Sequence, residues 1–73
     1  MRPIIDIVAT GANIRRLRAE REVTVAQIQD YLELQSPRAI YKWQAGVTLP
    51  SIDNLLGLSA LLKVSINDIL KTA

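Results

Sequence analysis

One short segment near the middle of the chain carries side chains that could contact a polyanion. Arg38 and Lys42 are cations one helical turn apart, with Tyr41 beside them. At about 100° per residue, an α-helix places these three side chains on one face and Ile40 and Trp43 on the opposite face. Guanidinium, ammonium and phenol groups can hydrogen-bond to the phosphates and base edges of nucleic acid. The same pattern also fits an ordinary amphipathic helix whose polar face is solvated.

The chain offers little for catalysis. It contains no His and no Cys, which removes zinc fingers, disulfides, thiol nucleophiles and the most common general base. It has no glycine-rich phosphate loop, and its acidic residues are scattered rather than paired: Asp6, Glu20, Glu22, Asp30, Glu33, Asp53 and Asp68. We therefore predict that the protein is not an enzyme and needs no cofactor, metal ion or small-molecule ligand.

Length and composition are those of one small globular domain. The chain has 73 residues, 49% of them hydrophobic, and its nine Lys and Arg against seven Asp and Glu give a net charge of +2. This mild excess of positive charge permits a nucleic-acid partner without requiring one. No apolar run approaches the roughly 18 residues of a membrane span, and the first residues lack the pattern of a signal peptide. We expect a cytoplasmic protein.

Helix-capping residues predict an all-α fold of five short helices, preceded by a short extended arm. β-Branched residues near the N-terminus favour the extended arm, which we place at residues 1–10 ahead of a domain at residues 11–71. Cap signals predict helix starts at Thr10, at a Thr24–Gln27 capping box, at Ser36–Pro37, at Pro50–Ser51 and at a Ser65–Asp68 capping box. The first helix is expected to end near Glu22 and the third before Gly46.

The second and third predicted helices are close in sequence. The second is expected to end near Leu32 and the third to occupy residues 36–44, which leaves Glu33, Leu34 and Gln35 as the connection. Two short helices joined by about three residues form a helix-turn-helix unit, in which the second helix enters the major groove of DNA. This context favours a binding role for the cationic face.

Residues 14–70 resemble the DNA-binding domain of the phage repressor and Cro-like helix-turn-helix family, the xenobiotic-response-element-type transcriptional regulators. The resemblance rests on an ordered set of short stretches, each weak alone. These are Ile14–Arg18, Val23–Thr24, Ile28, Leu32, Ala39–Gly46, Pro50–Ser51, Asn54–Leu56 and Leu62–Leu70. The most specific part is Trp43 with Gly46, followed by Pro50 with Ser51 and then by Val64, Ser65, Asp68 and Leu70.

The resemblance implies a compact lambda-repressor-like bundle that acts as a sequence-specific transcriptional repressor at the nucleoid, of bacterial or phage origin. It implies double-stranded DNA as the partner and a homodimer on an inverted repeat, with residues 36–44 in the major groove. The residues that it assigns to DNA contacts are Thr24, Gln27, Gln35, Ser36, Pro37, Arg38, Tyr41, Lys42 and Thr48.

The implied contacts on the third helix have a chemical rationale. Arg38 can pair bidentately with guanine, and Lys42 can reach a base or a phosphate. Tyr41 can donate to phosphate or touch a thymine methyl, or it is simply an exposed helix residue. Ser36 is first of all a helix cap that also attracts phosphate, and Pro37 mainly starts the helix.

The other implied contacts lie at the edges of the unit. The capping box is a sufficient structural explanation for Thr24 and Gln27, which the resemblance places against phosphate. The loop at residues 45–48 is expected to offer backbone N–H groups and the Thr48 hydroxyl to phosphate.

The chain departs from the family's pattern in the turn. Glu33 stands where the family usually has Gly, and a left-handed Glu costs roughly 1 kcal/mol. The distance from Ile28 to Trp43 is also one residue longer than usual, so we expect a longer turn without a left-handed residue. Gln44 stands where a Glu often pairs with the arginine that matches Arg18, which predicts a hydrogen bond to a neutral partner there.

Apolar residues at helical spacing predict the core and leave a surplus for a dimer surface. The expected core residues are Ile14, Leu17, Ile28, Leu32, Ile40, Trp43, Leu55, Leu58 and Leu62. The segment Ile4–Val8 either pairs with its copy in a dimer or packs on its own domain. Leu56 and Leu61 are the other candidates for a dimer surface.

The alternative function is a protein-interaction module that keeps this fold but does not bind DNA. The modest net charge favours it, as do Glu33 and Val25, which stands where the family often has a phosphate-binding Gln. An electropositive surface around Arg38 and Lys42 would count against this alternative, and an apolar surface would count for it.

Overall fold

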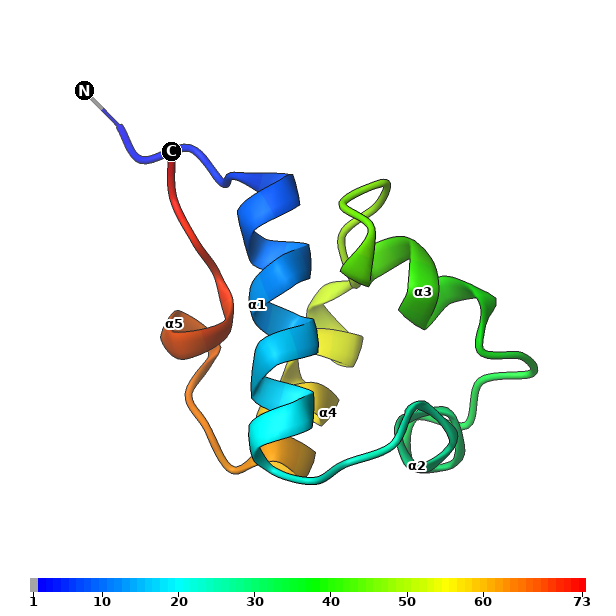
Figure 1. The fold of residues 1–73 in the computed structure, drawn as a ribbon. Helices are drawn as coiled ribbons and strands as arrows, with labels where there is room; N and C mark the ends of the chain where they lie inside the picture. The colour runs from blue at the N-terminus through cyan, green and yellow to red at the C-terminus, as the bar shows by residue number, and fades with distance from the viewer. Residues whose placement is uncertain (1) are drawn as a thin grey trace.

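The computed structural model describes residues 2–73, which fold as five helices around one apolar core (Figure 1). The helices are α1 (Ile7–Glu20), α2 (Val25–Tyr31), α3 (Arg38–Gln44), α4 (Ile52–Leu62) and α5 (Ile66–Ile69). This part of the chain contains no strand beyond one isolated bridge. The predicted all-α class and the five short helices are therefore confirmed.

Helix α1 begins earlier than predicted. It starts at Ile7, so the predictions that Thr10 caps it and that residues 7–9 are extended are wrong. Asp6 is the cap, and its Oδ1 accepts a hydrogen bond from the Ala9 N–H at 2.9 Å. A capping carboxylate also interacts favourably with the helix dipole, and this outweighs the preference of the β-branched residues for extended backbone.

Two buried polar residues of α1 fasten the C-terminal segment to that helix. The Thr10 hydroxyl accepts from the Lys71 N–H at 2.9 Å and donates to the Lys71 carbonyl at 3.3 Å. The Asn13 Nδ2 donates to the carbonyls of Asp68 and Ile69 at 2.7 Å and 2.9 Å. Thr10 therefore has a tertiary role in place of the predicted capping role.

The two ends of the described chain lie side by side (Figure 1). The Ala73 N–H donates to the Ile4 carbonyl at 2.8 Å, and Ile5 and Thr72 form an antiparallel bridge. The segment Ile4–Val8 was predicted either to pair with its copy or to pack on its own domain. Its first two residues, Ile4 and Ile5, pack on their own domain.

Four helices end in the same backbone motif. A left-handed residue follows α1, α2, α3 and α4 in turn, namely Glu22, Glu33, Gly46 and Lys63, with φ of 56°, 56°, 74° and 58°. In each case the next N–H bonds to the carbonyl five residues before it, at 2.9 to 3.1 Å. This is the Schellman motif, which satisfies carbonyls that have no partner within the helix. The predicted end of the third helix at Gly46 is confirmed.

The turn between α2 and α3 differs from the prediction in length and conformation. It spans residues 32–37 instead of 33–35, and Glu33 is left-handed, which contradicts the expected turn without such a residue. The Glu33 N–H bonds to the Asp30 carbonyl at 3.1 Å, and the Leu34 N–H bonds to the Gln29 carbonyl at 2.9 Å. These two bonds close the end of α2 and offset the steric cost of about 1–2 kcal/mol for a left-handed non-glycine residue.

Helix α3 begins at Arg38, one residue later than the Ser36–Pro37 signal predicted. Pro37 is the cap residue, and its carbonyl accepts the Tyr41 N–H at 3.2 Å. The Ser36 hydroxyl still accepts a hydrogen bond from the Arg38 N–H at 3.3 Å. Its predicted place as the cap residue is wrong because the proline, with φ of −80° and ψ of 0°, already lies in the turn that leads into the helix.

The remaining predicted helix starts are confirmed. Thr24 and Ser65 each form the predicted capping box, with Gln27 and Asp68 as their partners. Ser51 caps α4 by accepting from the Asn54 N–H at 3.2 Å.

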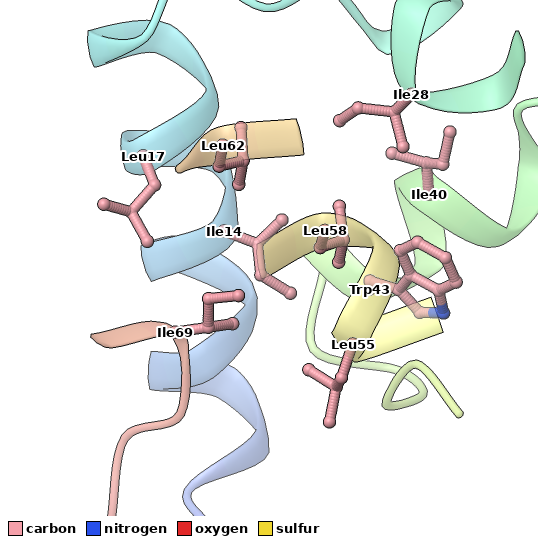
Figure 2. Close-up of a cluster of buried hydrophobic side chains, with 9 residues drawn as sticks. All are labelled: Ile14, Leu17, Ile28, Ile40, Trp43, Leu55, Leu58, Leu62 and Ile69. Atoms are coloured by element: carbon pink, nitrogen blue, oxygen red, sulfur yellow. The ribbon is translucent and has the colours of Figure 1, made fainter. Parts of the chain in front are cut away.

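The core lies between α1, α3 and α4 and is closed by α2 and α5 (Figure 2). Its buried residues are Ile14, Leu17, Ile28, Ile40, Trp43, Leu55, Leu58, Leu62 and Ile69. Eight of these were predicted. Leu32 is only partly buried at the edge of the core, and Ile69 is the additional member.

Among residues 2–73, no helix is both long enough and apolar enough to cross a membrane.

Candidate nucleic-acid interface

Helix α3 has one face locked into the core and one face open to solvent. Ile40 and Trp43 are 0% and 4% exposed, and Figure 2 shows both side chains within the apolar cluster. Tyr41 is 55% exposed, and Arg38 and Lys42 are exposed as well. The division predicted from helical spacing is therefore confirmed, and the core fixes the direction in which the three polar side chains point.

Close packing of backbone against backbone positions α3 on α1. Gly11 is buried in α1, and a Cβ at this position would overlap the carbonyl oxygen of Trp43 and lie 3.0 Å from the Gln44 carbonyl oxygen and from the Gly46 nitrogen. Gly46, in turn, packs against Val8, whose Cα would lie 2.8 Å from an added Cβ. The C-terminal end of α3 is thus held against the first turns of α1.

A side-chain hydrogen bond completes the contact between α1 and α3. The Arg18 Nε donates to the Gln44 Oε1 at 3.0 Å, and the Arg18 Nη1 donates to the Val23 carbonyl at 3.2 Å. The predicted hydrogen bond to a neutral partner is confirmed. Because it ties the last helical residue of α3 to α1, this bond supports the orientation of α3.

A surface hollow runs along the exposed side of α3. It has a volume of about 510 Å³ and a predominantly apolar lining. We call it the α3 hollow, and its lining residues are Ser36, Pro37, Arg38, Tyr41, Lys42, Ala45 and Val47. Five of the nine residues predicted to contact DNA are brought together here.

The other four predicted residues lie outside this hollow. Thr24 and Gln27 are exposed at the start of α2, where the Thr24 N–H donates to Gln27 Oε1 at 2.8 Å and the Gln27 N–H donates to Thr24 Oγ1 at 3.0 Å. Gln35 is exposed in the turn before α3, and Thr48 is exposed in the loop after it. All four side chains are accessible, so none is excluded from a contact by burial.

The backbone of the loop after α3 is not free to bind phosphate, contrary to the prediction. The Gly46 N–H donates to the Trp43 carbonyl at 3.1 Å, and the Val47 and Thr48 N–H groups point to the Lys42 carbonyl at 3.0 Å and 3.5 Å. These groups close the Schellman motif of α3 instead. The Thr48 side chain is what this loop can still offer to a phosphate.

Arg15 is a candidate contact that the sequence did not single out. It lies beside α3 and lines a second hollow together with Arg18, Tyr41, Gln44 and Ala45. Helical spacing can place Arg15 on a face of α1, but no local pattern shows that this face adjoins α3.

Three cations on or beside α3, Arg15, Arg38 and Lys42, have no ion-pair partner among the described residues. Residues 34–52 contain Arg38 and Lys42 and no acidic residue. Among the described residues one ion pair forms, between Arg16 Nη1 and Glu20 Oε1 at 2.9 Å. Arg15, beside α3, is therefore unpaired. This surface can attract a polyanion, and the apolar hollow within it can take up apolar groups.

The family model described as helix-turn-helix matches residues 14–69. The chain belongs to the helix-turn-helix family. Its members are DNA-binding regulators, so this chain is a DNA-binding domain of that kind and not an enzyme. No curated protein matches the chain closely enough in sequence to indicate a relative.

Three solved structures of other proteins share the fold. The restriction-modification controller protein C.AhdI from Aeromonas hydrophila has a TM-score of 0.77 at 20% identity, covering 88% of this chain and 96% of that chain. The clp gene regulator ClgR from Corynebacterium glutamicum has a TM-score of 0.76 at 26% identity, covering 85% of this chain and 65% of that chain. The DNA-binding domain of BldD has a TM-score of 0.72 at 14% identity, covering 89% and 93% of the two chains.

Proposed function

We propose that this helix-turn-helix protein is a sequence-specific repressor of transcription that binds an inverted repeat in DNA as a homodimer. It acts in the cytoplasm at the nucleoid, with α3 in the major groove. The observation that carries the proposal is the division of α3 into a core face, held by Ile40 and Trp43, and an open face with Arg38, Tyr41 and Lys42.

The dimensions of α3 suit the major groove. Seven residues span about 10.5 Å at 1.5 Å per residue, and the groove is about 12 Å wide. Because the core holds the opposite face, α3 can enter the groove without losing its own packing. Arg38 is the candidate for direct base reading, since its planar fork matches the two acceptors of guanine.

Groups around α3 can fix its position by contacting phosphate. Arg15 on α1, Thr24 and Gln27 at the start of α2, and Thr48 after α3 are exposed on elements that adjoin α3. Contacts of this type set the register of a protein on the duplex and carry no sequence information.

The proposed dimer follows from the small size of the reading element. One seven-residue helix reaches only a few base pairs, whereas specific interfaces usually bury about 1,000–2,500 Å² of protein surface. Two copies related by a twofold axis double the contacts and match the symmetry of an inverted repeat. The names of C.AhdI and ClgR, a controller protein and a gene regulator, support the regulatory part of the proposal.

The test is a selection of binding sites from random duplex DNA by the purified protein at two salt concentrations. We expect one enriched inverted repeat, retained at the higher salt. A reporter gene with this repeat inside its promoter should then be expressed less when the protein is present. Expression that rises with the protein would contradict the repressor assignment, and retention lost at moderate salt with no enriched motif would contradict sequence-specific binding altogether.

The predominantly apolar lining of the α3 hollow favours a second candidate, the protein-interaction module. Such a module would use the hollow to take up apolar side chains of a protein partner. The selection experiment separates the two functions because this module would enrich no DNA motif.

A further inference from the structure

The α3 hollow presents apolar side chains to solvent on the open face of α3. Tyr41 and Val47, at 55% and 63% exposed, present a ring and a branched side chain to solvent. Exposed Ala45 and half-buried Pro37 complete the apolar part of its lining. Because Tyr41, Ala45 and Val47 stay exposed among the described residues, the hollow can receive an apolar group from outside.

Charge complementarity points to a duplex as the source of that group. Arg38 and Lys42 belong to the same lining, and residues 34–52 contain no acid. A polyanion is therefore attracted to the hollow, whose lining also contains the apolar groups of Pro37, Tyr41, Ala45 and Val47. An occupant that satisfies both conditions has negative charge around an apolar group.

The major groove of DNA contains one such group. Base edges there present hydrogen-bond acceptors and donors, and the C5 methyl of thymine is the apolar exception. Placing an apolar side chain against a polar edge removes water from that edge without replacing its hydrogen bonds, which is unfavourable. Placing it against the methyl removes apolar surface of both partners from water, which is favourable.

Resting on the proposed function, we infer that the α3 hollow binds a thymine methyl group and that Tyr41 and Val47 are specificity-determining residues. The methyl lies near the base that Arg38 reads. Arg38 and Tyr41 are three residues apart, about 4.5 Å along the helix axis, and successive bases of one strand are about 3.4 Å apart. The recognised half-site therefore contains a thymine within about one or two base pairs of the base read by Arg38.

Deoxyuridine tests this inference directly because it lacks the methyl group of thymidine and keeps the same pairing and the same acceptor. The duplex enriched in the selection experiment is prepared with each thymidine replaced in turn by deoxyuridine, and binding is measured by competition titration. Burial of one methyl corresponds to about a fourfold change in affinity. We expect one replacement per half-site to weaken binding by about that factor and the others to have little effect.

Two variants assign the effect to the hollow. In Val47→Ala the apolar wall recedes, and we expect the ratio of affinities for the thymidine and deoxyuridine duplexes to approach one. Ile52→Ala is the matched control, since Ile52 is 73% exposed at the start of α4 and does not line the hollow. It should keep the ratio of the unmodified protein, and circular dichroism should show that both variants are folded.

The outcomes are distinguishable. The inference is overturned, and the proposed function stays in place, if a motif is enriched but no deoxyuridine replacement weakens binding to it. The same holds if Val47→Ala keeps the ratio of affinities for the thymidine and deoxyuridine duplexes. Failure of the selection to enrich any motif overturns the proposed function, and the inference with it.

Discussion

Arg38 and Lys42 both project from the open face of α3, but their side chains suit different partners. If Arg38 pairs with a base, Arg38→Ala should cost about 1–3 kcal/mol on the selected site and relax the preference at one position. If Lys42 touches phosphate alone, Lys42→Ala should weaken binding to all sequences alike and lower the slope of log affinity against log salt by about 1. Titrations of both variants against selected and random duplexes measure these effects.

The two roles have opposite signatures, so each variant serves as the control for the other. An equal loss on selected and random DNA would remove Arg38 from base reading. A loss confined to the selected site would place Lys42 among the base-reading residues.

Asp68 gives the stability of the protein a dependence on acid pH. The pKa of its carboxyl lies below the ordinary value of 3.8, first because the Ser65 backbone N–H donates to it, at 3.1 Å, and also because of the Ser65 side chain. The positive charges of Lys71 and Arg21 lower this pKa further, while desolvation opposes the shift. A carboxyl with a lowered pKa stabilises the fold above its unfolded pKa, and this contribution is lost as the pH falls through the folded pKa.

We therefore expect Asp68→Asn to flatten the acid limb of the stability profile. The melting temperature of the unmodified protein should fall more steeply than that of the variant between about pH 6 and about pH 2. Thermal unfolding followed by circular dichroism measures both profiles. Parallel profiles would show that the capping box around α5 contributes no pH-dependent stability.

For single residues, the sequence predicts those placements that depend on helical spacing alone. The opposite placement of Arg38 and Trp43 follows from the position of each residue in its own helix. The position of Arg15 next to Tyr41 does not, because it depends on how α1 crosses α3. The exposed Val47 side chain does not follow from the sequence either, because the loop pattern indicates only backbone N–H groups and the Thr48 hydroxyl as contacts.

The ends of the helices show how one backbone motif accepts unlike residues. Gly46 needs no strain to be left-handed, whereas Glu22, Glu33 and Lys63 adopt the same conformation against a steric cost. Glu33→Gly should therefore raise the free energy of unfolding by about 0.5–1 kcal/mol. Glu33→Ala removes the same charge and keeps the strain, so it should give no such gain. Urea denaturation compares the three proteins, and equal gains in both variants would trace the effect to charge.

The packing of α3 on α1 depends on a missing side chain. In Gly11→Ala the new methyl meets the backbone of Trp43 and Gln44, so we expect the free energy of unfolding to fall by about 1–3 kcal/mol despite the better helix propensity of Ala. Gly57→Ala is a matched control, since its methyl meets the flexible end of Leu32. Urea denaturation should show little change for Gly57→Ala. Equal losses in the two variants would contradict a specific role of Gly11.

Helix starts were predictable where the cap and its partner are neighbours in sequence. The boxes at Thr24 and Ser65 are such cases, because each of the two side chains, three residues apart, accepts from the backbone N–H of the other residue. Thr10 is the counterexample, since its hydroxyl bonds to Lys71 and the competing cap Asp6 lies one turn upstream. The left-handed Glu33 was missed because residue type alone argues against that conformation.

At the scale of the molecule, the dimensions are compatible with half-sites of the proposed operator that lie one turn of DNA apart. The protomer measures 38 × 22 × 20 Å, so two copies side by side can place their α3 helices about one turn of DNA apart, or about 34–36 Å. Inserting about five base pairs between the half-sites rotates one of them by half a turn and should reduce the affinity to that of a single half-site. Gel-shift titrations measure this loss. Unchanged affinity would show that the protomers bind independently.

The pairing of the chain's ends has a practical consequence for following the protein in cells. The Ala73 N–H donates to the Ile4 carbonyl, and Figure 1 shows both ends of the described chain on one side of α1 with α3 on the other. A fluorescent protein fused at either end would therefore lie on the same side of the domain, away from α3. Either fusion could therefore report occupancy of the operator in a living cell without blocking access to it.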